Sequence, residues 1–178
     1  MKTLRRGGFT LIELMVTLAI LAAMLALAAP SFIAFQRNSE LRGAANDILA
    51  ALLTARSEAL KRNANVFVVA TDSDWTKGWT IYVDADMDLN WTSAGDSTLA
   101  THGALPKSVT LTTGAGNFGS VDYAVMFNGA GFPKQKSNGA SPLSGTIGIE
   151  NGSEFRRIVL SNAGRARVCK ATSASSSC

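Results

Sequence analysis

A long apolar run near the N-terminus constrains this chain more than any other feature of its sequence. Within residues 14–29 only Thr17 is not apolar, and three of the residues that precede the run are basic. The predominantly apolar segment 9–35 exceeds the roughly 20 residues that a helix needs to cross a bilayer. Basic residues ahead of a span favour a cytoplasmic N-terminus. The sequence therefore predicts one membrane-spanning segment, with the rest of the chain on the far side of the membrane.

Glu13 is the anomaly in this segment. A carboxylate inside a membrane helix costs about 2.5–3.5 kcal/mol on insertion scales, and such residues usually have a partner and a function. A secretory signal peptide would supply a basic region, an apolar region and a cleavage site after small residues. Glu13 interrupts the start of the apolar region, however, and no clear A-x-A site follows it. Neither a signal peptide nor an ordinary anchor accounts for this residue.

Residues 8–14, G-F-T-L-I-E-L, resemble the class III leader of type IV pilins and type II secretion pseudopilins. In that family a membrane-embedded prepilin peptidase cuts after the glycine and methylates the new N-terminus. The resemblance implies cleavage between Gly8 and Phe9, an N-methylated Phe9, and Glu13 as the fifth residue of the mature chain. In a filament of staggered helices, the Glu13 carboxylate would neutralise the α-amine of a neighbouring Phe9 in a medium of low dielectric. The alternative is an unpaired Glu13 that reaches the membrane interface.

The helix is expected to continue beyond the apolar run. Pro30 should kink it, which a membrane segment tolerates. Apolar residues then recur in alternating steps of four and three, which is typical of one face of an amphipathic helix. This stripe consists of Leu41, Ala45, Ile48, Leu52, Ala55 and Ala59. A helix over residues 10–62 would be about 80 Å long, so half of it must serve a membrane and then an assembly.

Beyond Asn65 the period of the apolar pattern changes to two residues, which predicts strands. They are expected at 66–69, 79–83, 109–112, 121–127, 146–149, 157–160 and 166–169. The predicted fold class is α+β, a long N-terminal helix packed on an antiparallel two-sheet β domain. An additional helix in residues 90–107, where the pattern is vague, is the alternative.

The expected organisation has four parts. A leader peptide of residues 1–8 precedes the transmembrane and assembly half of the helix, 9–35. The amphipathic half of the helix, 36–63, leads into a β-rich globular pilin domain, 64–178.

Two stretches of the β region resemble the GspH/FimT family of minor pilins and pseudopilins. Residues 75–84, W-x-x-G-W-x-I-Y-V-D, look like the first β-hairpin of that family. Residues 161–169, S-N-A-G-R-A-R-V-C, resemble the end of its FimT branch, where a G-R-x-R motif is associated with DNA capture by pili in natural transformation. The resemblance implies a non-enzymatic minor subunit of a type IV pilus. The alternative is a minor pseudopilin of a type II secretion system that acts in protein export.

The resemblance also implies where the chain resides and what it contacts. It would enter the inner membrane as a single-pass protein with its N-terminus in the cytoplasm, and would then pass through the periplasm into the pilus fibre. The expected partners are other pilin subunits, the prepilin peptidase, the inner membrane and DNA.

The charge distribution supports a basic site near the C-terminus. Residues 107–178 carry eight basic and three acidic side chains, whereas residues 72–96 carry six acids and one Lys. Gly164 can supply a positive-φ turn, after which Arg165 and Arg167 share one strand face. Guanidinium groups bind phosphate through paired hydrogen bonds. Together with these features, the resemblance to the FimT branch implies a site that binds the DNA backbone without sequence preference, and a solvated strand edge is the alternative. The other members expected in the patch are Arg156 and Arg157, ahead of the neighbouring strand, and Lys170.

The two cysteines, Cys169 and Cys178, are expected to form a disulfide. The anchor places them outside the cytoplasm, where disulfides persist. Two ligands alone would make a poor zinc site.

Three remaining features are interpreted as structural. Asp84, Asp86, Asp88 and Asn90 imitate the start of a calcium loop, but Leu89 and Gly95 stand where such a loop needs glycine and glutamate. An acidic hairpin loop is therefore favoured. His102 is the only histidine and is expected to be solvated in a loop, so no catalytic residue, metal or cofactor is predicted. Core or loop packing is favoured over base stacking for the three tryptophans, Trp75, Trp79 and Trp91.

Overall fold

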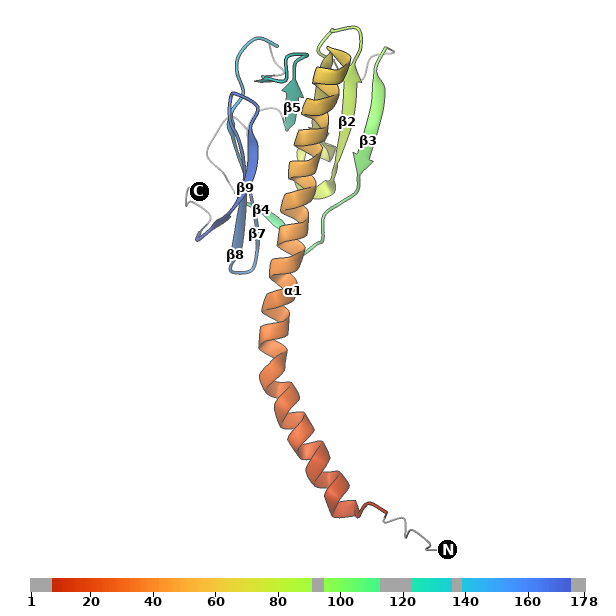
Figure 1. The fold of residues 1–178 in the computed structure, drawn as a ribbon, viewed down its shortest axis with the longest axis vertical. Coiled ribbons are helices and arrows are strands. Elements are labelled where there is room, and N and C mark those ends of the chain that lie inside the picture. The colour runs from red at the N-terminus through yellow and green to blue at the C-terminus, as the bar shows by residue number, and fades with distance from the viewer. Residues whose placement is uncertain (1–7, 91–94, 113–122, 136–138, 174–178) are drawn as a thin grey trace, which may run out of the picture. The chain divides into compact units, whose positions relative to one another are not determined.

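The computed structural model describes residues 8–90, 95–112, 123–135 and 139–173, without the side chains of residues 27–30. The chain divides into two compact units, Met1–Gln36 and Arg37–Cys178. The helix α1, Leu11–Arg62, contributes to both units (Figure 1).

In the first unit, α1 begins at a threonine cap. The backbone N–H of Glu13 donates to the Thr10 hydroxyl oxygen over 3.2 Å, which satisfies one of the free amides of the first turn. Glu13 therefore lies in the first turn, where the helix dipole stabilises a negative charge. The side chains from Leu11 to Ala26 are exposed.

Among the described residues, no single helix is both long and apolar enough to cross a membrane. The segments Leu11–Ala26 and Ser31–Arg62, which meet at a break, pass together by length and composition. The kink expected at Pro30 falls in this break, on residues whose side chains are not described, and stays a prediction.

In the second unit, one face of α1 is buried. All six residues of the predicted stripe are at 0% exposure, and Ala44 and Ala51 join them. The helix ends at Asn63, which has a φ of 50°, and the backbone N–H of Ala64 donates to the Ala59 carbonyl oxygen, as at many helix C-termini. The predicted amphipathic helix is confirmed.

Two antiparallel sheets follow the helix, so the predicted α+β class is confirmed. The first sheet has the order β3-β2-β1-β5-β6 and the second β4-β7-β8-β9. The strands of the first sheet are β1 Asn65–Ala70, β2 Trp79–Asp84, β3 Ser97–His102, β5 Ala124–Phe127 and β6 Pro133–Lys134. Those of the second are β4 Thr110–Thr112, β7 Gly145–Asn151, β8 Glu154–Leu160 and β9 Ala166–Ala171. Two short 3₁₀ turns, η1 Thr71–Ser73 and η2 Trp75–Lys77, connect β1 to β2.

One core joins the helix to both sheets. It contains the helix stripe together with residues of the first sheet, such as Val68 and Val125, and of the second, such as Ile149 and Ile158. Figure 1 shows the second half of α1 alongside the sheets. Trp75 and Trp79 are each 2% exposed within this core, as expected, whereas Trp91 lies outside the described residues.

The alternative of a helix in residues 90–107 is wrong for the described part of that region. Residues 97–102 form β3, which pairs with β2 in antiparallel register from Trp79 opposite His102 to Val83 opposite Ser97. The strand is an edge strand with mostly exposed side chains, so its polar sequence shows no apolar alternation.

Candidate functional site

The predicted basic motif forms the turn between β8 and β9. The backbone N–H of Gly164 donates to the Ser161 carbonyl oxygen over 2.9 Å, and the N–H of Ser161 donates to the Arg165 carbonyl oxygen over 3.0 Å. Gly164 has a φ of +78°, as the sequence predicted. A Cβ atom on Gly164 would lie 2.5 Å from the carbonyl oxygen of Gly131, so both its conformation and its surroundings require glycine.

Arg165 and Arg167 are exposed, while Ala166 and Val168 pack against the core. The alternation of strand side chains thus places the two guanidinium groups away from the core. Lys170 is also exposed, but its ammonium lies 3.0 Å from a carboxylate oxygen of Glu154. Two exposed arginines and one paired lysine therefore remain at this surface.

Arg156 and Arg157 do not belong to this surface, which corrects the prediction. Both lie inside β8 rather than ahead of it, and each is only 6% exposed. Arg156 donates from Nη2 to the Asn38 side-chain oxygen over 2.6 Å and from Nη1 to the Phe155 carbonyl over 3.1 Å. Alternation along β8 puts Arg156 on the same face as Ile158, which is buried in the core, so its guanidinium ties β8 to the helix.

Arg56 of α1 holds the basic turn in place. Its Nε donates to the Gly131 carbonyl oxygen over 3.0 Å, and its Nη2 donates to the Ala163 carbonyl oxygen over 3.4 Å. It therefore bridges the β5–β6 turn and the β8–β9 turn. The sequence places Arg56 away from the apolar stripe, but a helical period carries no sign of partners 75 and 107 residues away.

The acidic loop after β2 is held together by its own backbone. Carboxylate oxygens of Asp84, Asp86 and Asp88 lie within 4.8 Å of one another. The N–H of Asp88 donates to Asp84 over 3.1 Å and to Asp86 over 3.3 Å, and the N–H of Asn90 donates to Asp88 over 2.6 Å. Burial raises the pKa of Asp84, while the hydrogen bond from the Asn65 amide opposes that rise. The geometry is that of a braced acidic turn.

His102 differs from the expected solvated loop residue. It ends β3 and stacks on Trp79, with ring centroids 4.2 Å apart and an angle of 7° between the ring planes. Its Nε2 lies 3.7 Å from a carboxylate oxygen of Asp47 on α1. The imidazole thus links the edge strand β3 to Trp79 of β2 and to Asp47 of α1.

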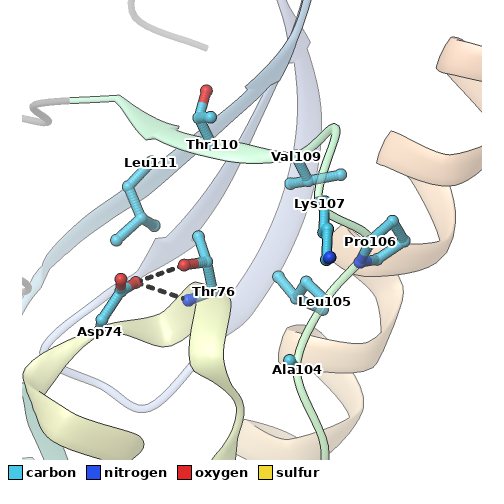
Figure 2. Close-up of a pocket in the computed structure, with 9 residues that line it drawn as sticks. All are labelled: Asp74, Thr76, Ala104, Leu105, Pro106, Lys107, Val109, Thr110 and Leu111. Atoms are coloured by element: carbon cyan, nitrogen blue, oxygen red, sulfur yellow. Dashed lines mark hydrogen bonds between the residues drawn. The ribbon is translucent and has the colours of Figure 1, made fainter.

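A cleft of about 410 Å³ lies between η2 and β4 (Figure 2). Its wall is largely apolar, with Leu105, Val109 and Leu111. The Asp74 carboxylate in it accepts hydrogen bonds from the backbone N–H and the hydroxyl of Thr76, at 2.8 and 2.7 Å (Figure 2).

Two other predicted sites are only partly described. Gly8 and Phe9 precede α1 and are exposed. Cys169 lies in β9, but Cys178 is outside the described residues, so the disulfide between them stays a prediction.

Comparisons with known proteins show which family this architecture belongs to. The family model described as Type II transport protein GspH matches residues 44–164, and the one described as Prokaryotic N-terminal methylation motif matches residues 3–29. The Pilin-like protein PilA1 of Thermus thermophilus is 28% identical over 173 residues, which cover 92% of this chain and 98% of that protein.

Two solved structures share the fold. The type IV minor pilin FimU of Pseudomonas aeruginosa has a TM-score of 0.57 at 22% identity, covering 79% of this chain and 98% of that chain. The minor pseudopilin EpsH from the Type 2 Secretion System of Vibrio cholerae has a TM-score of 0.51 at 17% identity, covering 74% and 97%. Since the GspH model matches more than half of the chain and the methylation motif precedes it, this chain belongs to the GspH family of minor pilins and pseudopilins.

Proposed function

We propose that this subunit serves in a type IV pilus and binds extracellular DNA through the β8–β9 turn, without sequence preference, during natural transformation. The observation that carries the proposal is the pair of exposed guanidinium groups, Arg165 and Arg167, that directly follow the fixed turn at Gly164. Residues 155–178 contain no Asp or Glu, and neither do residues 123–149, which supply the adjoining β5–β6 turn. The local field therefore favours a phosphate backbone.

The burial of Arg156 and Arg157 sets the expected strength. Each phosphate neutralised contributes about 0.9 to the slope of log K against log salt on duplex DNA, so two arginines give a slope of about −1.8. The dissociation constant of one subunit is expected at the weak end of the non-specific range, on the order of 10⁻⁴ M. Backbone contacts position a protein on DNA without reading the bases.

The experiment titrates fluorescently labelled duplex DNA with the full chain in detergent, at two salt concentrations. The Arg165→Ala/Arg167→Ala variant should bind more weakly, with a flatter salt dependence. The control, Arg42→Ala/Lys107→Ala, removes two exposed positive charges elsewhere and should bind like the wild type. Equal affinity of the wild type and the Arg165/Arg167 variant, or affinity that salt does not change, would reject the site.

The N-terminal unit supports the proposed route into the fibre. Its methylation motif suits a prepilin peptidase that cuts between Gly8 and Phe9 and methylates Phe9. The exposed apolar side chains from Leu11 to Ala26 suit insertion first into the inner membrane and then among the helices of other subunits. Glu13 would pair there with the α-amine of a neighbouring Phe9, because an unpaired buried charge is costly.

A minor pseudopilin of a type II secretion system is the second candidate, and the shared fold with EpsH favours it. That role exports proteins and does not need the two exposed arginines. A strain that lacks the gene, tested for both transformation and protein secretion, separates the candidates. Loss of transformation with normal secretion supports the pilus, and the reverse result supports the secretion machine.

A further inference from the structure

An exposed aromatic ring lies beside the basic turn. Among the described residues of the second unit, Phe132 is the only exposed aromatic residue, at 47% exposure. It belongs to the β5–β6 turn, where its N–H donates to the Asn128 side-chain oxygen over 2.9 Å and its carbonyl accepts from the Asn128 N–H over 3.1 Å. The turn thus holds a large apolar ring in water on a fixed backbone.

The two turns that carry the ring and the arginines are in contact. A Cβ on Gly164 would lie 2.5 Å from the Gly131 carbonyl oxygen, and Arg56 donates to the carbonyl groups of both turns. Phe132 follows Gly131 and Arg165 follows Gly164, so their Cα atoms are at most about 14 Å apart. Leu60, also exposed, lies against Gly131 and widens the apolar surface.

We infer that Phe132 makes this site a single-strand binding site, in which the arginines hold phosphates and the ring stacks on a base. This inference rests on the proposed DNA binding and names the form of DNA. In a duplex the bases are paired and stacked inside, so a surface ring cannot reach their faces. A single strand offers every base as a π-surface, and stacking of bases on aromatic side chains beside a basic groove is the usual means of binding it.

The alternative binding partner for the exposed Phe132 ring is a neighbouring subunit. The basic surroundings favour nucleic acid, because residues 123–149 and 155–178 supply basic residues and no acid. A ring that stacks on bases should also tolerate exchange for another aromatic ring, whereas an apolar contact between subunits should tolerate leucine.

The test compares a labelled oligothymidine strand with a duplex of equal length, titrated with the full chain in detergent. Phe132→Ala and Phe132→Leu should weaken single-strand binding by roughly 5- to 100-fold and leave duplex binding within about twofold. Phe132→Tyr should retain the single-strand affinity. Met87→Ala, which truncates an exposed apolar side chain on the acidic loop, is the control and should change neither affinity. Thermal melting of each variant confirms that the fold is kept.

The outcomes separate this inference from the proposed function. If the wild type binds no DNA, or the Arg165→Ala/Arg167→Ala variant binds both forms as the wild type does, the proposed function fails and this inference fails with it. If that variant weakens both forms but Phe132→Ala leaves the ratio of the two affinities unchanged, only the single-strand inference fails. Normal DNA binding by Phe132→Ala together with defective pilus assembly would assign the ring to a subunit contact.

Discussion

Replacing Gly164 by alanine should unfold the globular unit at a lower temperature. An alanine in the left-handed region costs about 1–2 kcal/mol relative to glycine. Its Cβ would also meet the Gly131 carbonyl oxygen at 2.5 Å and Arg56 Nε at 3.0 Å, so the hydrogen bond between those two groups must lengthen or break. Weakening this partly buried hydrogen bond from a charged donor adds about 1–3 kcal/mol. The expected loss is therefore about 2–5 kcal/mol.

The globular unit has a matched control for this change. A Cβ on Gly43 of α1 meets nothing within 4 Å, and Gly43 lies inside a helix without a positive φ. Alanine in a helix interior is more stable than glycine by about 0.5–1 kcal/mol. Gly43→Ala should therefore raise the melting temperature, while Gly164→Ala lowers it.

Intrinsic tryptophan fluorescence of the full chain in detergent is a suitable assay, because Trp75 and Trp79 are both buried in the globular core. For a unit of this size the loss corresponds to a fall in Tm of about 5–15 °C. A Gly164→Ala melting temperature within about 2 °C of the wild type would refute the packing argument. A fall of the same size in Gly43→Ala would show that alanine substitution itself is not tolerated.

Three further changes test other parts of the chain. Arg156→Ala should lower the free energy of unfolding by about 1–3 kcal/mol, because the half-buried Asn38 side chain loses its donor, and chemical denaturation measures this. Burial raises the pKa of Asp84 above its ordinary value of 3.8, so the neutral form is favoured in the fold. The wild type should therefore lose stability as the pH rises above about 4, because Asp84 must then ionise in a buried position. The Asp84→Asn variant cannot ionise there, so its stability relative to the wild type should increase over the same pH range. A stability difference that does not change with pH would contradict this. Gly8→Arg should accumulate as an uncleaved precursor, which an immunoblot detects.

The helix and the basic turn could be predicted because their signals are local. The alternating steps along residues 41–59 determine which face of the helix is apolar. That face must be buried, whichever element packs on it. Gly164 before two arginines is likewise a local pattern, since a turn of positive φ and the alternation after it involve adjacent residues only. The structure has both features where the sequence places them.

The errors arise where distant segments meet. The sequence of β3 is mostly polar and its side chains are mostly exposed because it is an edge strand, so its existence depends on pairing with β2 and not on its own period. Arg156 was expected in the basic patch, ahead of the strand, but it lies within β8, where the register of the whole sheet decides which face meets the helix. Its burial is possible because Asn38, more than a hundred residues earlier, provides an acceptor.

The fixed geometry of the basic turn lowers the entropy cost of DNA binding at a site that is weak in each single subunit. Two exposed arginines cannot give tight binding alone, and each long side chain loses rotamer freedom when it grips a phosphate. Arg56 and Gly164 fix the backbone conformation of the turn that carries Arg165. Binding therefore costs little additional backbone conformational entropy in this turn. Several such turns along one fibre would act at high effective concentration on a single DNA molecule, so that avidity supplies retention while each contact stays short-lived. A subunit with this turn is therefore better suited to transient grip at many points than to tight binding at one.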